Sequence, residues 1–260
     1  MESIPKQVHF IGIGGAGMSA LANVLLTLGY QVSGSDLVAT HVTQRLEALG
    51  GKCYIGHNEK NVQDARLVVI SSAINPDNPE LIRAREKGIP VIHRAELLAW
   101  LMSRQKGIAV AGAHGKTTTT SMLALALEKN GLDPTIIIGG ELNDIGGNAK
   151  LGRGEYVVAE SDESDGSFLK LRPLAAIVTN IEDDHLDHYG SLENIKAAFK
   201  TFLAQIPSQG KAVVCLDDPH TREVIGGLNT PFITYGFHDQ ADYTLQEISL
   251  NGRHTRGEVY

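Results

Sequence analysis

The stretch VHFIGIGGAG, residues 8–17, decides the fold of the first half of the chain. Its first four residues form an apolar strand that leads directly into a glycine-rich turn. Apolar residues then recur at helical spacing as far as Leu28, and residues 31–36 form a second strand that ends in an acid. A strand, a turn, a helix and a second strand within about 30 residues make a βαβ unit. This order predicts an α/β protein.

The turn matches the pattern G-x-G-x-x-G at Gly12, Gly14 and Gly17, and Asp36 lies nineteen residues beyond Gly17. Glycines let the backbone approach a pyrophosphate, and the amides and dipole of the helix N-terminus hold its charge. The acid can accept hydrogen bonds from a ribose. A tight turn that only packs the strand against the helix has the same pattern. We therefore expect a pyrophosphate site whose ligand the pattern does not identify.

A second strand and loop, IAVAGAHGKT at residues 108–117, repeat this arrangement with different chemistry. Backbone amides in such a loop cradle the phosphates of a nucleoside triphosphate, Lys116 reaches the β and γ oxygens, and the Thr117 hydroxyl can ligate Mg²⁺. The spacing is G-x-x-G-K-T, because Val110 stands where the longer Walker pattern has glycine. The alternative is a helix that merely begins with Lys-Thr.

Two further loops carry polar side chains directly after predicted strands. Four carboxylates lie within residues 160–165, and Glu160, nearest to the preceding strand, is our candidate Mg²⁺ ligand. The predicted strand 175–179 leads into a loop rich in His and Asp that contains His185. If these strands are neighbours, the three loops converge at the edge of the sheet where ligands bind in open α/β folds.

The predicted helix 219–225 begins with two residues whose roles stay open. Asp218 stands before a proline and can cap the helix, a role at least as well supported as contact with a ligand. Arg222, one turn into the helix, can reach a phosphate or point into solvent.

Composition excludes several classes of protein. The 260 residues are 42% hydrophobic but only 5% aromatic, so aliphatic side chains must fill most of the core. A net charge of −7 gives no sign of nucleic-acid binding. Two distant cysteines offer neither a disulfide framework nor a cysteine zinc site. No segment has the roughly 18 uninterrupted apolar residues of a membrane span, so we expect a cytoplasmic protein without membrane insertion.

The polar stretch at residues 103–107 interrupts the apolar pattern, which restarts at residue 108. We place a domain boundary there. The prediction is a Rossmann-like domain over residues 1–105, followed over residues 106–260 by a P-loop ATPase-like domain with a mainly parallel sheet.

In combination, these motifs resemble the Mur ligases from about residue 8 to residue 237. The resemblance rests on residues 9–18, 33–36, 71–74, 114–120, 162–165 and 179–181. It implies an ATP-dependent ligase of peptidoglycan precursor synthesis. The implied reaction joins L-alanine to the muramyl carboxylate of UDP-N-acetylmuramate through an acyl phosphate.

The resemblance also implies two binding sites and the residues that form them. The UDP-sugar contacts would come from the first glycine loop and nearby strand ends, at Gly14, Gly15, Ala16, Gly17, Met18, Ser35, Asp36, Ser71, Ser72, Ala73 and Arg94. The ATP contacts would come from the second loop and the start of its helix, at Gly112, Ala113, His114, Gly115, Lys116, Thr117 and Thr118. Arg222 is our further candidate for an ATP contact, from its place in the later helix.

The resemblance further implies three catalytic positions. Lys116 would bind phosphate, Glu160 would bind Mg²⁺ together with Thr117, and His185 would bind a second Mg²⁺ that bridges to the reacting carboxylate. ATP and Mg²⁺ are therefore the expected cofactors, and UDP-N-acetylmuramate and L-alanine the expected substrates.

The chain departs from the family pattern at three points. Ala113 stands where Thr or Ser is usual, so we expect weakened nucleotide binding. Ser161 replaces a usual alanine, which we expect to be harmless. Family members continue into a third domain, which leads us to expect that these 260 residues bind substrates but catalyse poorly.

Two other functions stay open at this point. A nicotinamide-dependent oxidoreductase with an added P-loop domain would use Asp36 on the cofactor ribose. The low aromatic content and the lack of a clear hydride-transfer dyad in the sequence argue against it. A nucleotide-binding module without catalytic activity is the other alternative.

Overall fold

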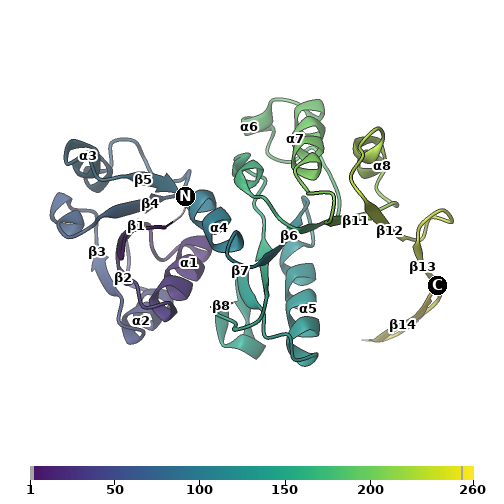
Figure 1. Cartoon of the computed structure of the whole chain (residues 1–260), viewed down its shortest axis with the longest axis horizontal. Helices are drawn as coiled ribbons and strands as arrows, with labels where there is room; N and C mark the ends of the chain where they lie inside the picture. Colours follow the sequence, from purple (N-terminus) through teal and green to yellow (C-terminus); the bar gives the residue numbers. More distant parts are fainter. Residues whose placement is uncertain (1–2, 253) are drawn as a thin grey trace. The chain divides into compact units, whose positions relative to one another are not determined.

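The computed structural model describes residues 3–252 and 254–260 (Figure 1). The chain folds into two compact units. Unit 1 comprises the residues up to Gln105 together with Thr120–Ala159, and unit 2 comprises Lys106–Thr119 and Glu160–Tyr260. Both units combine helices with mainly parallel strands, so the predicted α/β class is confirmed.

The first sheet of unit 1 has five parallel strands in the order β3-β2-β1-β4-β5. The strands are β1 (Gln7–Ile11), β2 (Gln31–Asp36), β3 (Lys52–Ile55), β4 (Leu67–Ile70) and β5 (Val91–His93). The helices between them are α1 (Ala16–Thr27), α2 (His41–Ala48), α3 (Pro79–Glu86) and α4 (Arg94–Met102), with a 3₁₀ turn, η1, at Glu59–Val62. Because β1 is central, its residues Val8, Phe10 and Ile11 are buried whichever face of the sheet they point to.

The remainder of unit 1 packs against the start of α1. It contains most of α5 (Lys116–Lys129), β7 (Thr135–Leu142), η2 (Asn143–Ile145), β8 (Gly147–Lys150) and most of β9 (Tyr156–Glu160). β7 pairs in parallel with β9 and antiparallel with β8. The Asn148 amide donates to the Ala16 carbonyl at 2.8 Å and to the Ser19 hydroxyl at 2.9 Å, which ties β8 to the first turn of α1.

Unit 2 is built on four parallel strands in the order β6-β10-β11-β12. These are β6 (Lys106–Ala111), β10 (Ala175–Val178), β11 (Lys211–Cys215) and β12 (Phe232–Gly236), and the hairpin of β13 (Tyr243–Asn251) and β14 (His254–Val259) follows. The helical elements are η3 (Ser167–Lys170), α6 (Leu186–Tyr189), α7 (Leu192–Ala204) and α8 (Pro219–Ile225).

An aromatic cluster packs η3 against α7 in the core of unit 2. The ring of Phe168 lies 5.2 Å from that of Phe199 and 5.0 Å from that of Phe202, and all three side chains are buried. This packing holds η3, and with it the acidic loop that precedes η3, against α7. Within the described part of the chain, no helix is long and apolar enough to cross a membrane.

Candidate functional site

The loop between β6 and α5, at Gly112–Gly115, is shaped by a close approach that only glycine permits. A Cβ atom on Gly112 would lie 2.1 Å from the Thr179 hydroxyl oxygen, and the residue has a φ of +132°. β6 and β10 pair in parallel with Ala111 opposite Val178, so the loops after both strands lie at the same edge of the sheet. The close approach therefore brings the Gly-Lys-Thr loop against the loop that carries His185.

Hydrogen bonds from that neighbouring loop hold the backbone of His114. The Thr179 hydroxyl donates to the His114 carbonyl at 2.7 Å. The Asn180 side chain accepts from the His114 N–H at 2.9 Å and donates to its carbonyl at 3.0 Å. The Ala113 N–H binds the Asn180 carbonyl at 3.2 Å. Hydrogen bonds from Thr179 and Asn180 to the loop backbone therefore set its conformation, and none of them needs a hydroxyl at position 113.

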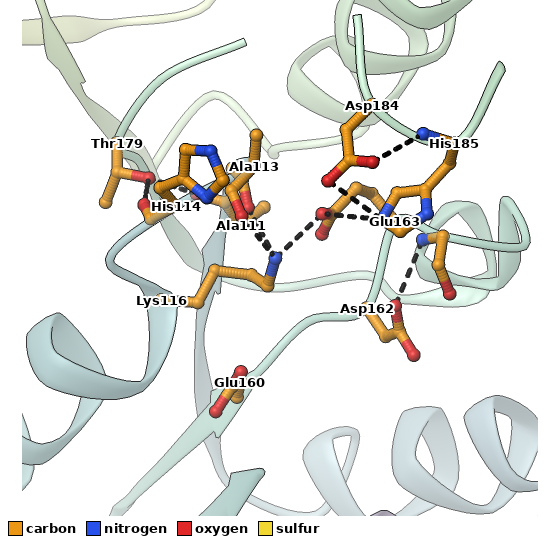
Figure 2. A network of polar contacts seen from close by, with 12 residues as sticks. Ala111, Ala113, His114, Lys116, Glu160, Asp162, Glu163, Thr179, Asp184 and His185 are labelled. Carbon is orange, nitrogen blue, oxygen red and sulfur yellow. Dashed lines mark hydrogen bonds and ion pairs between the residues drawn. The ribbon is translucent and has the colours of Figure 1, made fainter. Parts of the chain in front are cut away.

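Lys116 is the first residue of α5, and its ammonium group contacts this loop. Its Nζ donates to the Gly112 carbonyl at 2.6 Å, to the Ala113 carbonyl at 3.2 Å and to Glu163 Oε1 at 2.7 Å. Figure 2 shows the side chain extended toward Glu163, with His185 and Asp184 on the other side of that carboxylate. An ammonium group held beside a glycine-rich loop at the start of a helix suits the oxygens of a phosphate chain.

Thr117 and Glu160 form a second contact within the site. The Thr117 hydroxyl lies 3.1 Å from Glu160 Oε1 and 3.0 Å from Oε2. Two adjacent ligands of an octahedral Mg²⁺ with bonds of about 2.0–2.1 Å are about 2.9 Å apart. The separation and the all-oxygen donor set therefore fit a shared Mg²⁺.

Glu163 is a site residue that the sequence did not single out from the acidic loop. Its side chain is only 4% exposed and lies between Lys116 Nζ and His185 Nε2, which is 3.8 Å from Oε1. Burial raises the pKa of the Glu163 carboxyl, and the hydrogen bond from Lys116 opposes that shift. Its Oε2 is buried and has no hydrogen-bond partner among the described residues.

His185 precedes α6 and has a left-handed backbone, with a φ of +58°. Its N–H donates to Asp184 Oδ1 at 2.8 Å, and its Nε2 lies 3.6 Å from Asp184 Oδ2. The imidazole therefore faces two carboxylates. Among the residues that the structure describes, no three His, Cys, Asp or Glu side chains are grouped so that they could hold a metal ion.

Asp218 and Arg222 both make contacts within unit 2. Asp218 caps α8 by accepting from the N–H groups of His220 and Thr221, so the predicted capping role is confirmed. It also accepts from the Ile181 N–H at 3.0 Å, which links α8 to the loop after β10. The Arg222 guanidinium donates to the Leu216 carbonyl.

In unit 1, the first glycine loop meets β2 and α4. Asp36 Oδ2 accepts from the Gly14 N–H at 2.8 Å, and Oδ1 accepts from the Leu37 N–H at 2.8 Å. A Cβ atom on Gly17 would lie 3.1 Å from Arg94 Nη1, so the guanidinium lies against the first turn of α1. A guanidinium beside a helix N-terminus favours the binding of a diphosphate at that position.

The other predicted UDP-sugar residues differ in exposure. Gly15, Ala16, Ser72 and Ala73 are exposed. Ser71 is partly buried, and the Ser72 hydroxyl lies 3.1 Å from His93 Nε2. Met18 and Ser35 have their side chains in the interior.

Two family models together match almost the entire chain. The model described as "Mur ligase family, catalytic domain" matches residues 7–106. The model described as "Mur ligase middle domain" matches residues 110–260.

The chain is also similar to curated proteins of greater length. It is 64% identical to a UDP-N-acetylmuramate–L-alanine ligase from Pelotomaculum thermopropionicum, over 98% of this chain and 56% of the relative. It is 58% identical to the protein of the same name from Desulforamulus reducens, over 100% of this chain and 57% of the relative. The chain thus spans about half the length of the curated relatives it matches.

Solved structures show the same fold. A UDP-N-acetylmuramate–alanine ligase from Thermotoga maritima superposes with a TM-score of 0.86 at 33% identity, over 97% of this chain and 57% of that one. A UDP-N-acetylmuramate:L-alanyl-γ-D-glutamyl-meso-diaminopimelate ligase from Neisseria meningitides gives 0.86 at 29% identity, over 94% and 82%.

Proposed function

The chain belongs to the Mur ligase family, and from that premise we propose that it carries the UDP-sugar and ATP sites of a UDP-N-acetylmuramate–L-alanine ligase of peptidoglycan precursor synthesis. The observation that carries the proposal is the convergence of Lys116, Thr117, Glu160, Glu163 and His185 at one edge of the unit 2 sheet. An ammonium group and several oxygen donors beside such a loop can bind a triphosphate and its Mg²⁺, as a reaction between a carboxylate and a triphosphate requires.

We assign the two ligands to the two halves of the chain. UDP-N-acetylmuramate would bind within residues 1–105, where Gly14, Gly17 and Arg94 surround the start of α1. ATP would bind within residues 106–260, with its β and γ phosphates at the Gly112–Gly115 loop and Lys116. The nicotinamide alternative is not favoured, because the family resemblance explains both loops together.

The reaction proposed has two steps. The muramyl carboxylate attacks the γ-phosphorus of ATP, which forms an acyl phosphate and releases ADP. The amine of L-alanine then attacks the acyl carbon, and phosphate and a proton leave as the amide bond forms. The first step brings like charges together, and the Lys116 ammonium offsets that repulsion.

Lys116 must exchange partners for this to occur. In the structure its Nζ binds two loop carbonyls and Glu163, so phosphate oxygens would replace some of these acceptors. Thr117 and Glu160 would hold one Mg²⁺, and His185 would contribute to a second. Bound Mg²⁺ supplies charge neutralisation of the phosphate oxygens.

Binding measurements test the proposal without relying on turnover. At about 100 times its dissociation constant, UDP-N-acetylmuramate should stabilise the protein against thermal unfolding by about 2.7 kcal/mol, whereas NAD should have no effect. ATP with Mg²⁺ should also stabilise it. The variant Lys116→Met should lose most of the thermal stabilisation by ATP. The control variant Lys129→Met, at the exposed far end of α5, should keep that stabilisation. Stabilisation by NAD but not by UDP-N-acetylmuramate would refute the proposal.

A further inference from the structure

A buried polar network in unit 1 includes Ser35, one of the residues of the proposed UDP-sugar site. Its centre is Glu80, in the first turn of α3, whose side chain is fully buried. Oε2 accepts from the Ser35 hydroxyl at 2.5 Å and lies 3.4 Å from His9 Nε2. Oε1 accepts from the Asn61 amide at 2.5 Å and from the Asn58 N–H at 3.2 Å. Two donors therefore serve each carboxylate oxygen.

These contacts keep Glu80 ionised. Burial by itself would raise the pKa of Glu80, but hydrogen bonds from His9, Ser35 and Asn61 outweigh it and lower that pKa to about 2. At neutral pH the carboxylate can only accept hydrogen bonds. The single hydroxyl proton of Ser35 is therefore directed at Glu80.

That direction determines the tautomer of His57. The Ser35 hydroxyl oxygen also lies 2.8 Å from His57 Nδ1. Because its proton is already donated to Glu80, Ser35 must accept from His57, so Nδ1 carries the hydrogen. In the neutral ring, Nε2 then has a lone pair and can only accept a hydrogen bond.

His57 lies near the carboxyl end of β2, where dinucleotide-binding folds contact the nucleoside of their ligand. It follows β3, and the preceding Gly56 N–H donates to the Asp36 carbonyl at 2.8 Å, at the carboxyl end of β2. In dinucleotide-binding folds an acid at this end of β2 binds the ribose. Here one Asp36 oxygen accepts from the Gly14 N–H of the glycine loop, and the other accepts from the N–H of the next residue, Leu37. The His57 side chain is 19% exposed at the same edge.

We propose that His57 is a nucleoside-binding residue, whose Nε2 accepts a hydrogen bond from the uridine of the UDP group, either from the ribose 2′-hydroxyl or from the imide N–H of the base. Ser35 and Glu80 are positioning residues that hold this nitrogen as an acceptor. The inference rests on the proposed UDP-sugar site in residues 1–105. With the imide N–H as the donor, the contact would also select uridine, because cytosine has no hydrogen on the corresponding ring nitrogen.

Calorimetric titration with UDP, 2′-deoxy-UDP and N3-methyl-UDP tests the contact. His57→Phe should weaken UDP binding about fivefold, as expected for one lost hydrogen bond. His57→Gln, which keeps an acceptor, should bind UDP more tightly than His57→Phe. If the donor is the 2′-hydroxyl, wild type and His57→Phe should bind 2′-deoxy-UDP equally well. If the donor is the imide N–H, they should bind N3-methyl-UDP equally well. His41→Phe, an exposed histidine on α2 of the same unit, should bind like the wild type.

The positioning role has a separate spectroscopic readout. Nitrogen-15 shifts of the His57 ring should report hydrogen on Nδ1 in the wild type, and Ser35→Ala should abolish that preference and weaken UDP binding. A wild-type ring with hydrogen on Nε2 would overturn the inference. So would equal UDP affinities of the wild type and His57→Phe, or a His57→Phe loss that persists with both analogues. If the wild type bound neither UDP nor UDP-N-acetylmuramate, the proposed function itself would fail.

Discussion

Replacing Glu80 by glutamine should remove a pH-dependent part of the stability of unit 1. The pKa of Glu80 is about 2 in the folded protein, against about 4.3 for an unperturbed glutamate. A lowered folded pKa stabilises the protein at pH values above the unfolded pKa, and that stabilisation disappears as the pH falls through the folded pKa. A difference of about 2.3 units at 1.36 kcal/mol per unit corresponds to about 3 kcal/mol.

The structure explains why glutamine is the informative substitution. Glutamine has the size of glutamate but presents an NH₂ group to two of the donors around it, much as protonated glutamate presents an O–H. The variant should therefore be about 3 kcal/mol less stable than the wild type at pH 7. The difference should fall to about half that value at pH 3, because the wild-type carboxylate loses its advantage as it gains a proton.

Urea unfolding followed by tryptophan fluorescence measures this difference. Trp100 is the only tryptophan of the chain, and it is buried on α4 of unit 1, so it reports on the unit that contains Glu80. The control is Glu86→Gln on the same helix, where an exposed ion pair with Arg83 should contribute at most about 1 kcal/mol. A difference between wild type and Glu80→Gln that stays constant from pH 7 to pH 3 would refute the reasoning.

Three further substitutions test the unit 2 site. Gly112→Ala should abolish measurable ATP binding and lower the melting temperature, because its Cβ atom would lie 2.1 Å from the Thr179 hydroxyl oxygen. Thr117→Val should weaken ATP binding about tenfold in the presence of Mg²⁺, but far less in EDTA, since in the proposed site the hydroxyl beside Glu160 would act through the metal. Asp218→Ala should cost about 1–2 kcal/mol in thermal unfolding through loss of the α8 cap, and an unchanged melting temperature would contradict that role.

Local patterns were sufficient to predict the elements that carry the two loops. The strand, turn and helix around residues 8–28 and around residues 108–129 lie where the apolar spacing predicts them. The pattern assigned no element to residues 37–66, which contain α2 and β3. α2 buries only two of its residues, and β3 is an edge strand without a fully buried residue. Periodicity is weak where so few side chains enter the core.

The candidate site was only partly accessible from sequence. The expected contact between the Gly-Lys-Thr loop and Glu160 exists, as Thr117 shows. Glu163 could not be separated from the other three carboxylates of its loop, because all four have the same chemistry. Its burial beside Lys116 depends on how η3 packs against α7.

The fold class, the family and the positions of the two glycine loops could be predicted from the sequence, because each is encoded by residues close together in the chain. The burial of Glu80 and Glu163, and the partners from which we infer the tautomer of His57, depend on the tertiary structure. In sequence, Glu80 is an ordinary acid in the first turn of a helix, after the cap residue Asn78 and a proline. Its role comes from partners 71 residues away at His9 and 45 away at Ser35, which the parallel sheet brings within hydrogen-bonding distance.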